Sequence, residues 1–364
     1  MSRLSILVLV GLISHALKAQ TPPIDLEWTA LRWFGNGTGV ITHDPVTNEH
    51  LWALQDDINT LNANDEVKLP FLPDGSDVAP AYPDRFNVGS LDHLVDLTVI
   101  DSVPYALMAH QNIGGVVQDQ YWHLFAGAAE LIIQSPEEDL LDVGLDMQVE
   151  ADAIYVCGSS MVGTANNDRG RSIKTDLQGN VLWDVLWDPV GTDALGRFSS
   201  VALLGDTVVM AAFPLLVLFD RNTGTFIDTE DPAALTPPLQ GDARLVAGSD
   251  RIHWACIQGN TLHFGYWSFT EGATGGGGAF FQTYATPPAG LDVVLGENGE
   301  WWIGTTAEGQ GRLLRVGTDA DLLSTSTLYA SITDLDFVNG KLSITGKLDA
   351  TNPTSYVLVG TPQP

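Results

Sequence analysis

Histidines are the first side chains to consider as metal ligands or general acid–base catalysts, because their ordinary pKa lies near neutrality. The 364-residue sequence has eight of them, and His15 lies close to the N-terminus. The others show neither H-x-x-x-H nor H-x-H spacing, and no cysteine forms a metal-like pattern with them. These seven are His43, His50, His93, His110, His123, His253 and His263. We therefore assign no metal ligand and no catalytic residue among them.

Two polar segments have the composition of ligand-binding loops but not the required spacing. DDINTLNANDEVK at 56–68 offers side-chain oxygens at Asp57, Asn59 and Asn62, but it lacks the Gly-then-Glu spacing of an EF-hand. TEGATGGGGAF at 270–280 does not end in the Gly-Lys-Ser/Thr of a phosphate-binding loop. A G-x-S-x-G nucleophile motif is missing as well. We interpret both segments as solvated loops, and the sequence predicts no metal and no cofactor.

The segments that would position any functional residue are copies of one thirteen-residue pattern. DMQVEADAIYVCG at 146–158 has an acidic start, two apolar residues at alternate positions, a turn and a second alternating run. Similar segments begin at residues 96, 200, 244, 292 and 334. The second and fourth columns are apolar in all six copies: Leu97, Met147, Val201, Leu245, Val293 and Leu335, then Val99, Val149, Leu203, Ala247, Leu295 and Phe337. This period of two indicates a half-buried strand.

Each copy is a strand–turn–strand hairpin. Its middle holds turn-forming residues, such as Gly205-Asp206 and Asn339-Gly340, that tolerate the backbone angles of a tight turn. The copies start 50, 54, 44, 48 and 42 residues apart. That spacing leaves room for two more strands and matches the roughly 40–50 residues of a four-stranded propeller blade. The sequence therefore predicts an all-β protein, a single β-propeller, in preference to a generic sandwich.

A second recurring phrase is interpreted as the outer hairpin of a blade. It occurs as THDPVTNEHLWAL from Thr42, KTDLQGNVLWDV from Lys174, LFDRNTGTFIDT from Leu218 and, more weakly, VGTDADLLSTST from Val316. An aspartate opens the turn in each copy: Asp44, Asp176, Asp220 and Asp319. These phrases resemble the outer hairpins of secreted, bacterial-type propellers of the PQQ-like and YVTN-like kind, over residues 24–361. The resemblance implies a propeller and leaves the chemistry open.

Seven blades are expected, with six as the alternative. The last repeat has room for about three strands, near 332–338, 341–347 and 355–360. The segment 24–55 holds strand material without a full copy of the inner hairpin. Both features are explained if the N- and C-terminal strands share one blade and close the ring, which protects the strand edges. The missing strand would then come from near Ile24–Trp33.

Propeller enzymes are a competing class. A sialidase-type S-x-D-x-G-x-x-W box is not matched by KTDLQGNVLW at 174–183, and quinoprotein dehydrogenases have larger chains with an adjacent cysteine pair that is missing here. Glycosidase propellers use a pair of carboxylates that converge on the substrate. The sequence has 45 acidic residues, and no pattern in it identifies such a pair. We therefore favour a non-catalytic binding or surface module, with a polysaccharide hydrolase or lyase as the alternative. Trp122, Trp187 and Trp267 lie outside the inner-hairpin columns, either on the rim or packed between blades.

The two cysteines are expected to stay unpaired. Cys157 falls in column twelve and Cys256 in column thirteen, so they point to opposite faces of equivalent strands two repeats apart. Neighbouring blades pack about 10 Å apart, whereas a disulfide requires α-carbons within about 7 Å. We predict two buried, inert thiols.

The N-terminus predicts export. MSRLSILVLVGLISHALKAQ has a basic residue, Arg3, then an apolar run over Leu4–Ile13 and small residues near Ala19. That is the layout of a secretory signal peptide, and the run is too short for a membrane span. We expect residues 1–20 to be removed, leaving residues 21–364 as one secreted or periplasmic propeller domain.

Charge limits the partners. Removing Arg3 and Lys18 leaves 14 basic residues against 45 acidic ones, a net charge of −31 for the mature chain. Such a charge repels nucleic acid and anionic membrane surfaces. We expect a monomer with a protein or glycan ligand, no nucleic acid, no membrane insertion, and no assignable ligand-binding residue.

Overall fold

The computed structural model describes the strand-forming part of the chain. The described residues are 24–33, 39–44, 46, 49–55, 67–68, 85–86, 92–111, 120–126, 129–133, 142–161, 168–188, 196–233, 235, 238–268, 280–328, 330–348 and 354–363. The predicted signal peptide lies outside them, as do nearly all of the 56–68 and 270–280 loops. None of the described residues belongs to a helix with the length and apolar character of a membrane span.

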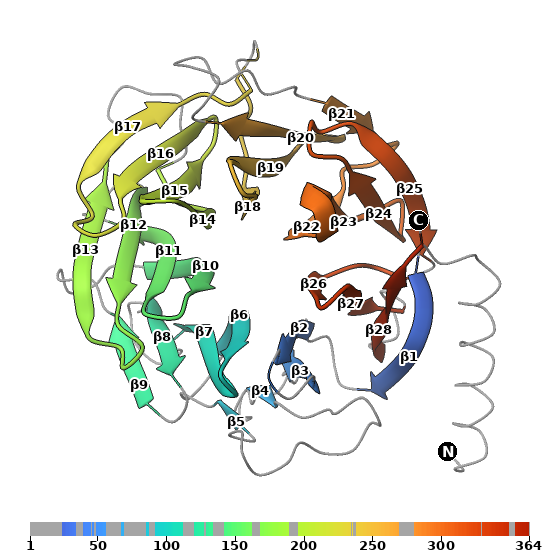
Figure 1. Ribbon diagram of the computed structural model, residues 1–364, viewed down its shortest axis with the longest axis horizontal. Coiled ribbons are helices and arrows are strands. Elements are labelled where there is room, and N and C mark those ends of the chain that lie inside the picture. The colour runs from blue at the N-terminus through green and yellow to red at the C-terminus, as the bar shows by residue number, and fades with distance from the viewer. Residues whose placement is uncertain are drawn as a thin grey trace.

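The described strands form seven four-stranded antiparallel sheets around a central axis (Figure 1). The first three sheets are β2 (Gly39–Asp44), β3 (Glu49–Gln55), β4 (Val67–Lys68) and β5 (Arg85–Phe86); β6 (Asp92–Ile100), β7 (Val103–Gln111), β8 (Gln120–Ala126) and β9 (Ala129–Ile133); and β10 (Asp142–Val149), β11 (Ile154–Met161), β12 (Asp168–Thr175) and β13 (Val181–Trp187). In each of these three sheets the strand order follows the sequence from the axis outward (Figure 1).

Three further sheets repeat this plan. They are β14 (Ser200–Leu204), β15 (Thr207–Ala212), β16 (Leu215–Asp220) and β17 (Phe226–Glu230); β18 (Ala243–Ala247), β19 (Arg251–Gln258), β20 (Thr261–Ser268) and β21 (Phe280–Thr283); and β22 (Ala289–Leu295), β23 (Trp301–Ala307), β24 (Gln310–Val316) and β25 (Leu322–Leu328). The fold is therefore the predicted β-propeller. Seven sheets agree with the preferred blade number, although the first is reduced, since β4 and β5 have two residues each.

The ring closes as predicted, because both ends of the chain contribute to the seventh sheet. Its strand order is β1 (Ile24–Trp33), β28 (Thr354–Pro362), β27 (Lys341–Lys347) and β26 (Asp334–Val338). The C-terminal strand β28 is thus interior and pairs with β1 on one side and β27 on the other. The N-terminal strand supplies the outer edge that the last repeat lacks.

The core consists of apolar layers between adjacent blades, which explains the alternating columns. Between the β14–β17 and β18–β21 blades, for example, Val209 and Leu218 share one buried cluster with Leu245 and Trp254. A single blade has two apolar faces and buries them only against its neighbours. The alternation of apolar residues in the sequence therefore results from packing between adjacent blades.

One predicted hairpin is wrong. The phrase from Thr42 is predicted to form an outer hairpin, but β2 and β3 are the inner two strands of the first blade. The phrases from Lys174, Leu218 and Val316 do form outer hairpins. Asp44 carries a turn in the same way as Asp176: each accepts a backbone N–H from the residue two positions later. Local turn chemistry therefore does not separate inner from outer hairpins.

The cysteines are buried and unpaired, as predicted. Cys157 packs with Val208 and Val217 on one side of the β14–β17 blade, and Cys256 packs with residues on its other side. A whole blade therefore separates the two thiols. Burial raises the pKa of Cys256 to about 12 and that of Cys157 well above its usual value, so neither thiol is activated.

Candidate functional site on the ring axis

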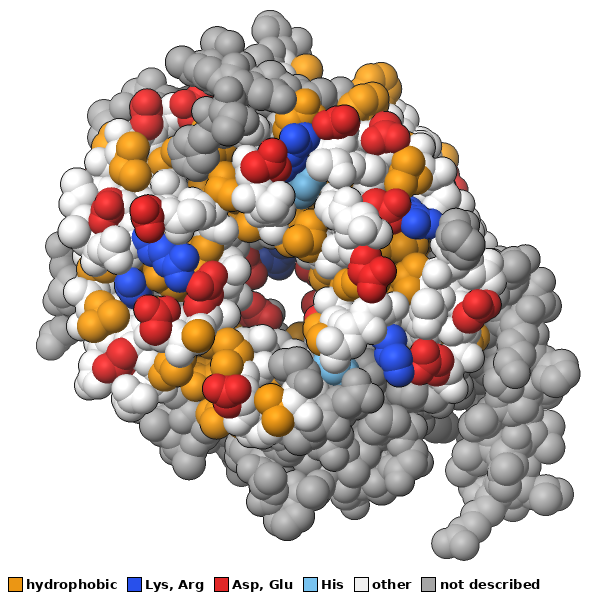
Figure 2. Space-filling model, in the orientation of Figure 1, with side chains coloured by type: hydrophobic (Ala, Val, Ile, Leu, Met, Phe, Trp, Pro, Cys, Tyr) orange, Lys and Arg blue, Asp and Glu red, His pale blue; other side chains and the backbone are white. Residues whose placement is uncertain are grey.

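The first column of the repeat pattern lines the ring axis. It lies on the innermost strands and reads Asp96, Asp146, Ser200, Arg244, Asp292 and Asp334. A cavity of about 330 Å³ lies there, and its polar lining includes the four aspartates of this column together with Asp336. Acidic and basic side chains surround the central opening (Figure 2). This cavity is the candidate functional site.

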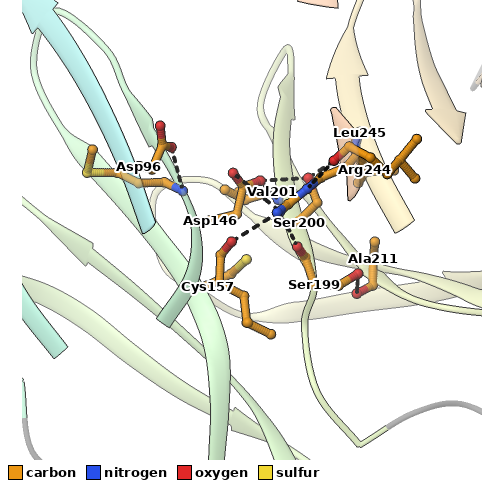
Figure 3. A network of polar contacts seen from close by, with 12 residues as sticks. Asp96, Asp146, Cys157, Ser199, Ser200, Val201, Ala211, Arg244 and Leu245 are labelled. Atoms are coloured by element: carbon orange, nitrogen blue, oxygen red, sulfur yellow. Dashed lines mark hydrogen bonds and ion pairs between the residues drawn. The ribbon is translucent and has the colours of Figure 1, made fainter. Parts of the chain in front are cut away.

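Each aspartate of the column accepts a hydrogen bond from the backbone of the following blade. Figure 3 shows this contact for Asp96 and Asp146. The donor is a backbone N–H on the innermost strand of the next blade, from a second-column residue in three cases and from Ile41 of β2 in the fourth. The donor–acceptor distances are 3.2, 2.8, 2.7 and 2.8 Å. The pairs are Met147 to Asp96, Val201 to Asp146, Leu335 to Asp292, and Ile41 to Asp334. We call these contacts axial latches. Ser200 does the same with its hydroxyl, which accepts the N–H of Leu245 at 3.0 Å.

The latches have a physical cause in the sheet geometry. An innermost strand has no neighbour on its axial side, so some of its N–H groups lack a ladder partner. A buried, unpaired N–H costs free energy, and a side-chain acceptor from the adjacent blade removes that cost. The Asp334 latch joins the last blade to the first, so the same contact closes the ring.

Two positions interrupt the series of latches. The first is Val40, which precedes Ile41 on β2 and whose apolar side chain cannot accept a hydrogen bond from the next blade. The N–H of Leu97 in that blade bonds instead to the carboxylate of its own neighbour Asp96 at 2.7 Å. Arg244 is a donor, and its guanidinium bonds to backbone carbonyls of three other blades: Leu145 at 3.1 Å, Ser199 at 2.9 Å and Leu291 at 3.3 Å. It therefore ties four blades together.

The axial carboxyls hold protons more strongly than free aspartates do. Burial, together with the charge of Asp146, raises the pKa of Asp96 to about 8. Burial also raises the pKa of Asp292 to about 6, against the attraction of Arg244, and it raises the pKa of Asp146 and of Asp334. The side chain of Asp146 remains 21% exposed. The surrounding blades therefore remove most, but not all, of the water around its carboxyl.

The charge of Arg244 is stabilised by the same group of carboxylates. Burial lowers the pKa of its guanidinium, but the carboxylates of Asp146, Asp292 and Asp96 outweigh burial, and the pKa lies above its usual value. Its Nη1 lies 4.0 Å from Oδ1 of Asp146. Arg244 is not among the residues that line the cavity, so the ionisable groups of the cavity wall are all carboxyls.

Asp336 differs from the other acids of the cavity. It lies on β26 two residues after Asp334, and its carboxylate accepts the backbone N–H of Phe337 and of His43. Its Oδ2 atom is buried without a hydrogen-bond partner. Burial raises the pKa of Asp336 to about 7. Asp336 therefore titrates near neutral pH, in the same range as Asp292 and Asp96.

The residues considered from sequence mostly have structural roles. His253 is buried against the ring of Trp301, with centroids 5.1 Å apart, and His43 is also buried. Trp187 stacks on Phe198, and Trp267 lies in an inter-blade core. Of the two alternatives for these tryptophans, packing between blades is therefore the one observed. The side chains of His50, His93, His110, His123 and Trp122 lie outside the described residues. Among the described residues no cluster of three or more His, Cys, Asp or Glu could hold a metal.

Sequence reasoning missed the axial aspartates. The sequence signal for these residues is the acidic start of the repeat. Reading that column down the six copies gives four aspartates, one serine and one arginine at equivalent positions. Equivalent positions of a propeller's inner strands converge on the axis, so the column would have indicated the site.

Comparison with protein-family models and with curated protein sequences gives no match. Solved structures do match. Virginiamycin B lyase from Staphylococcus aureus shares 12% identity with a TM-score of 0.56, covering 91% of this chain and 98% of the lyase. The propeller domain of Cps50 (Swd1) from Myceliophteria thermophila shares 10% identity at the same TM-score, covering 90% and 98%. BamB from Moraxella catarrhalis shares 11% identity at a TM-score of 0.46, covering 87% and 83%. At such identities the likeness establishes the β-propeller fold alone.

Proposed function

We propose that the mature chain is an exported, monomeric propeller that binds a protein or glycan ligand and does not catalyse a reaction. The observation that carries the proposal is the set of axial latches. The carboxylates that a propeller enzyme would aim at a substrate are here hydrogen-bonded to backbone N–H groups of the next blade. Their role in the fold accounts for their presence at the axis without any reaction.

Carboxylate catalysis places specific demands on the cavity. A glycosidase needs two carboxyl groups that reach opposite sides of one glycosidic bond, one as acid and one as base or nucleophile. Four of the five aspartates lining the cavity are latches, and moving one toward a substrate would leave a backbone N–H of the next blade unpaired. A binding module requires no such movement.

A panel of immobilised polysaccharides and basic proteins tests the proposal. The mature protein is passed over each, and both retention and released product are measured. We expect retention on at least one ligand with no product. Release of product by the wild-type chain would contradict the proposal, because a binding module leaves its ligand intact.

One observation favours the second candidate function, a hydrolase or lyase acting on polysaccharide. Asp336 lines the cavity, is not one of the latches, and has a pKa of about 7, which suits a general acid at neutral pH. Under this alternative, Asp336→Asn abolishes product release, whereas Asp228→Asn on the outer strand β17 leaves it unchanged. Equal activity of the two variants would remove Asp336 from consideration.

Export is part of the proposal and rests on residues 1–20. A charged start, an apolar run and small residues form the pattern that signal peptidases cleave. N-terminal sequencing of the protein recovered outside the cytoplasm should begin at Gln20 or Thr21. A sequence that began at Met1 or Ser2 would overturn it.

A further inference from the structure

The outer strands of four consecutive blades expose apolar pairs. These pairs are Val181-Leu182 on β13, Phe226-Ile227 on β17, Phe280-Phe281 on β21 and Leu322-Leu323 on β25. Each of these strands is the last of its sheet, so one of its edges has no ladder partner in the sheet. Exposed apolar edge strands can pair with strands of other chains, and proteins usually block this pairing with charges, bulges or prolines. We call an edge protected in this way blunted.

Three of the four edges are blunted. A register shift, which marks a β-bulge, places Leu182, Ile227 and Leu323 out of the ladder. A bulge twists the strand and interrupts its edge. β13 and β17 also carry the carboxylates of Asp184 and of Asp228 and Glu230.

The β21 edge is not blunted. Its pairing with β20 is continuous over the four residues, and the sequence FFQT contains no charge and no proline. Phe281 is 70% exposed, the largest value among the exposed apolar residues of the described chain. Phe280 stacks on Phe264 of β20, with centroids 6.1 Å apart, and this contact holds the start of the strand against its sheet.

We infer that the β21 edge is a docking site for an extended segment of another polypeptide, which adds a fifth strand to this blade. This inference rests on the proposed binding function and names its partner class. Backbone groups of the partner pair with the edge, and its alternate apolar side chains pack on Phe281.

Charge decides the chemistry of the partner. The protein carries a net charge of −29. None of the outer strands β13, β17, β21 and β25 contains a lysine or an arginine, and β13 and β17 contain acidic residues. A strand flanked by basic residues is therefore attracted, whereas an acidic strand or a second copy of this chain is repelled. Because β21 is short, the partner forms few backbone bonds and binds transiently.

The probe is a capped, fluorescent peptide in which valine and threonine alternate between terminal lysines. Its binding to the mature chain is measured by fluorescence anisotropy. Phe281→Lys blunts the edge and is expected to weaken binding at least tenfold. Ile227→Lys is the matched control, because it adds the same charge to an exposed apolar position on a bulged strand, and it is expected to change binding less than twofold. A peptide with a central proline should not bind.

Three outcomes would overturn the inference. These are no binding of the lysine-flanked peptide, equal weakening by the two lysine variants, and a wild-type dimer in sedimentation that Phe281→Lys dissociates, since a second copy would then occupy the edge. Retention on a polysaccharide without peptide binding would refute the docking site and leave the proposed binding function standing.

Discussion

At the scale of the residue, the axial carboxylates experience two opposing effects. Accepting an N–H stabilises the ionised form, whereas burial and neighbouring carboxylates stabilise the protonated form. At Asp96 the second effect is larger, and the pKa rises from 3.8 to about 8. Between these pH values the folded chain holds a proton that the unfolded chain releases. The stability that Asp96 contributes is therefore present at low pH and is lost as the pH rises through 8.

Asp96→Asn tests this effect. The single amide oxygen can keep one of the two N–H bonds that the carboxylate accepts, from Leu97 or from Met147, and the variant has no charge to repel its neighbours. We expect its melting temperature relative to that of wild type to rise from pH 4 toward pH 9, by about 2–4 °C for each kcal/mol gained. Melts across this pH range measure the difference. A constant difference at all pH values would mean that Asp96 does not titrate in this range.

His253 has the opposite pH dependence. Burial lowers its pKa from 6.5 to about 4, and neither ring nitrogen has a hydrogen-bond partner. Its contribution to stability is present above pH 6.5 and is lost as the pH falls toward 4, because the unfolded chain then binds the proton more strongly. The full difference corresponds to about 3 kcal/mol.

His253→Phe should remove this acid sensitivity, since phenylalanine keeps the stacking on Trp301 and does not ionise. Denaturant unfolding at pH 4.5 and pH 7.5 should show a smaller loss of stability for the variant than for wild type. His263→Phe is the comparison variant: burial also lowers the pKa of the half-buried His263, but less than that of His253, so a smaller change in acid sensitivity is expected. Equal pH slopes for wild type and His253→Phe would contradict the assignment.

At the scale of the element, the alternating columns predicted the hairpins well because inter-blade packing is a local requirement on each strand. The latches were not predicted, because each carboxylate bonds to a backbone N–H in another blade, 51 residues away for Asp96 and Met147. No local pattern reports such a partner. The prediction for the first blade is wrong for a related reason. Asp44 on an inner hairpin and Asp176 on an outer hairpin form the same kind of turn.

The outer turn of the β14–β17 blade depends on a glycine. Gly224 has a φ of +68°, and a Cβ there would lie 2.9 Å from the ring of Trp183 in the previous blade. Gly205 has a φ of +60° and no neighbouring atom within 4 Å. Gly205→Ala should cost about 1 kcal/mol for the left-handed backbone. Gly224→Ala should cost about 2–4 kcal/mol, because it adds overpacking. Equal costs in urea unfolding would show that this turn does not pack on the neighbouring blade.

At the scale of the whole molecule, the ring depends on its C-terminal strand. Tyr356, Val357, Leu358 and Val359 are at most 1% exposed. Each contributes roughly 1.5–3 kcal/mol, and a domain has a net stability of about 5–15 kcal/mol. Deleting residues 355–364 should therefore abolish cooperative melting or lower its midpoint by tens of degrees. Deleting only Gln363 and Pro364 should have a small effect. An unchanged midpoint for the longer deletion would contradict ring closure by β28.

The closure of the ring by both chain ends was predictable from the number of strands, because the last repeat lacks one strand and the segment Ile24–Trp33 belongs to no other repeat. The axial cavity was not, because its shape depends on how seven blades converge, and one blade's sequence does not contain that information. The ligand is harder still to predict, because a propeller scaffold accepts many ligands without changing its core.

The central claim is that the axial aspartates are latches, and the ring-closing one tests it most directly. Asp334 accepts the N–H of Ile41 at 2.8 Å. Melting temperatures at pH 7 are compared for wild type, Asp334→Asn, which keeps an acceptor, and Asp334→Leu, which does not. We predict that the asparagine variant melts at or above wild type and that the leucine variant loses about 1–3 kcal/mol for its unpaired N–H. A leucine variant as stable as the asparagine variant would contradict the account.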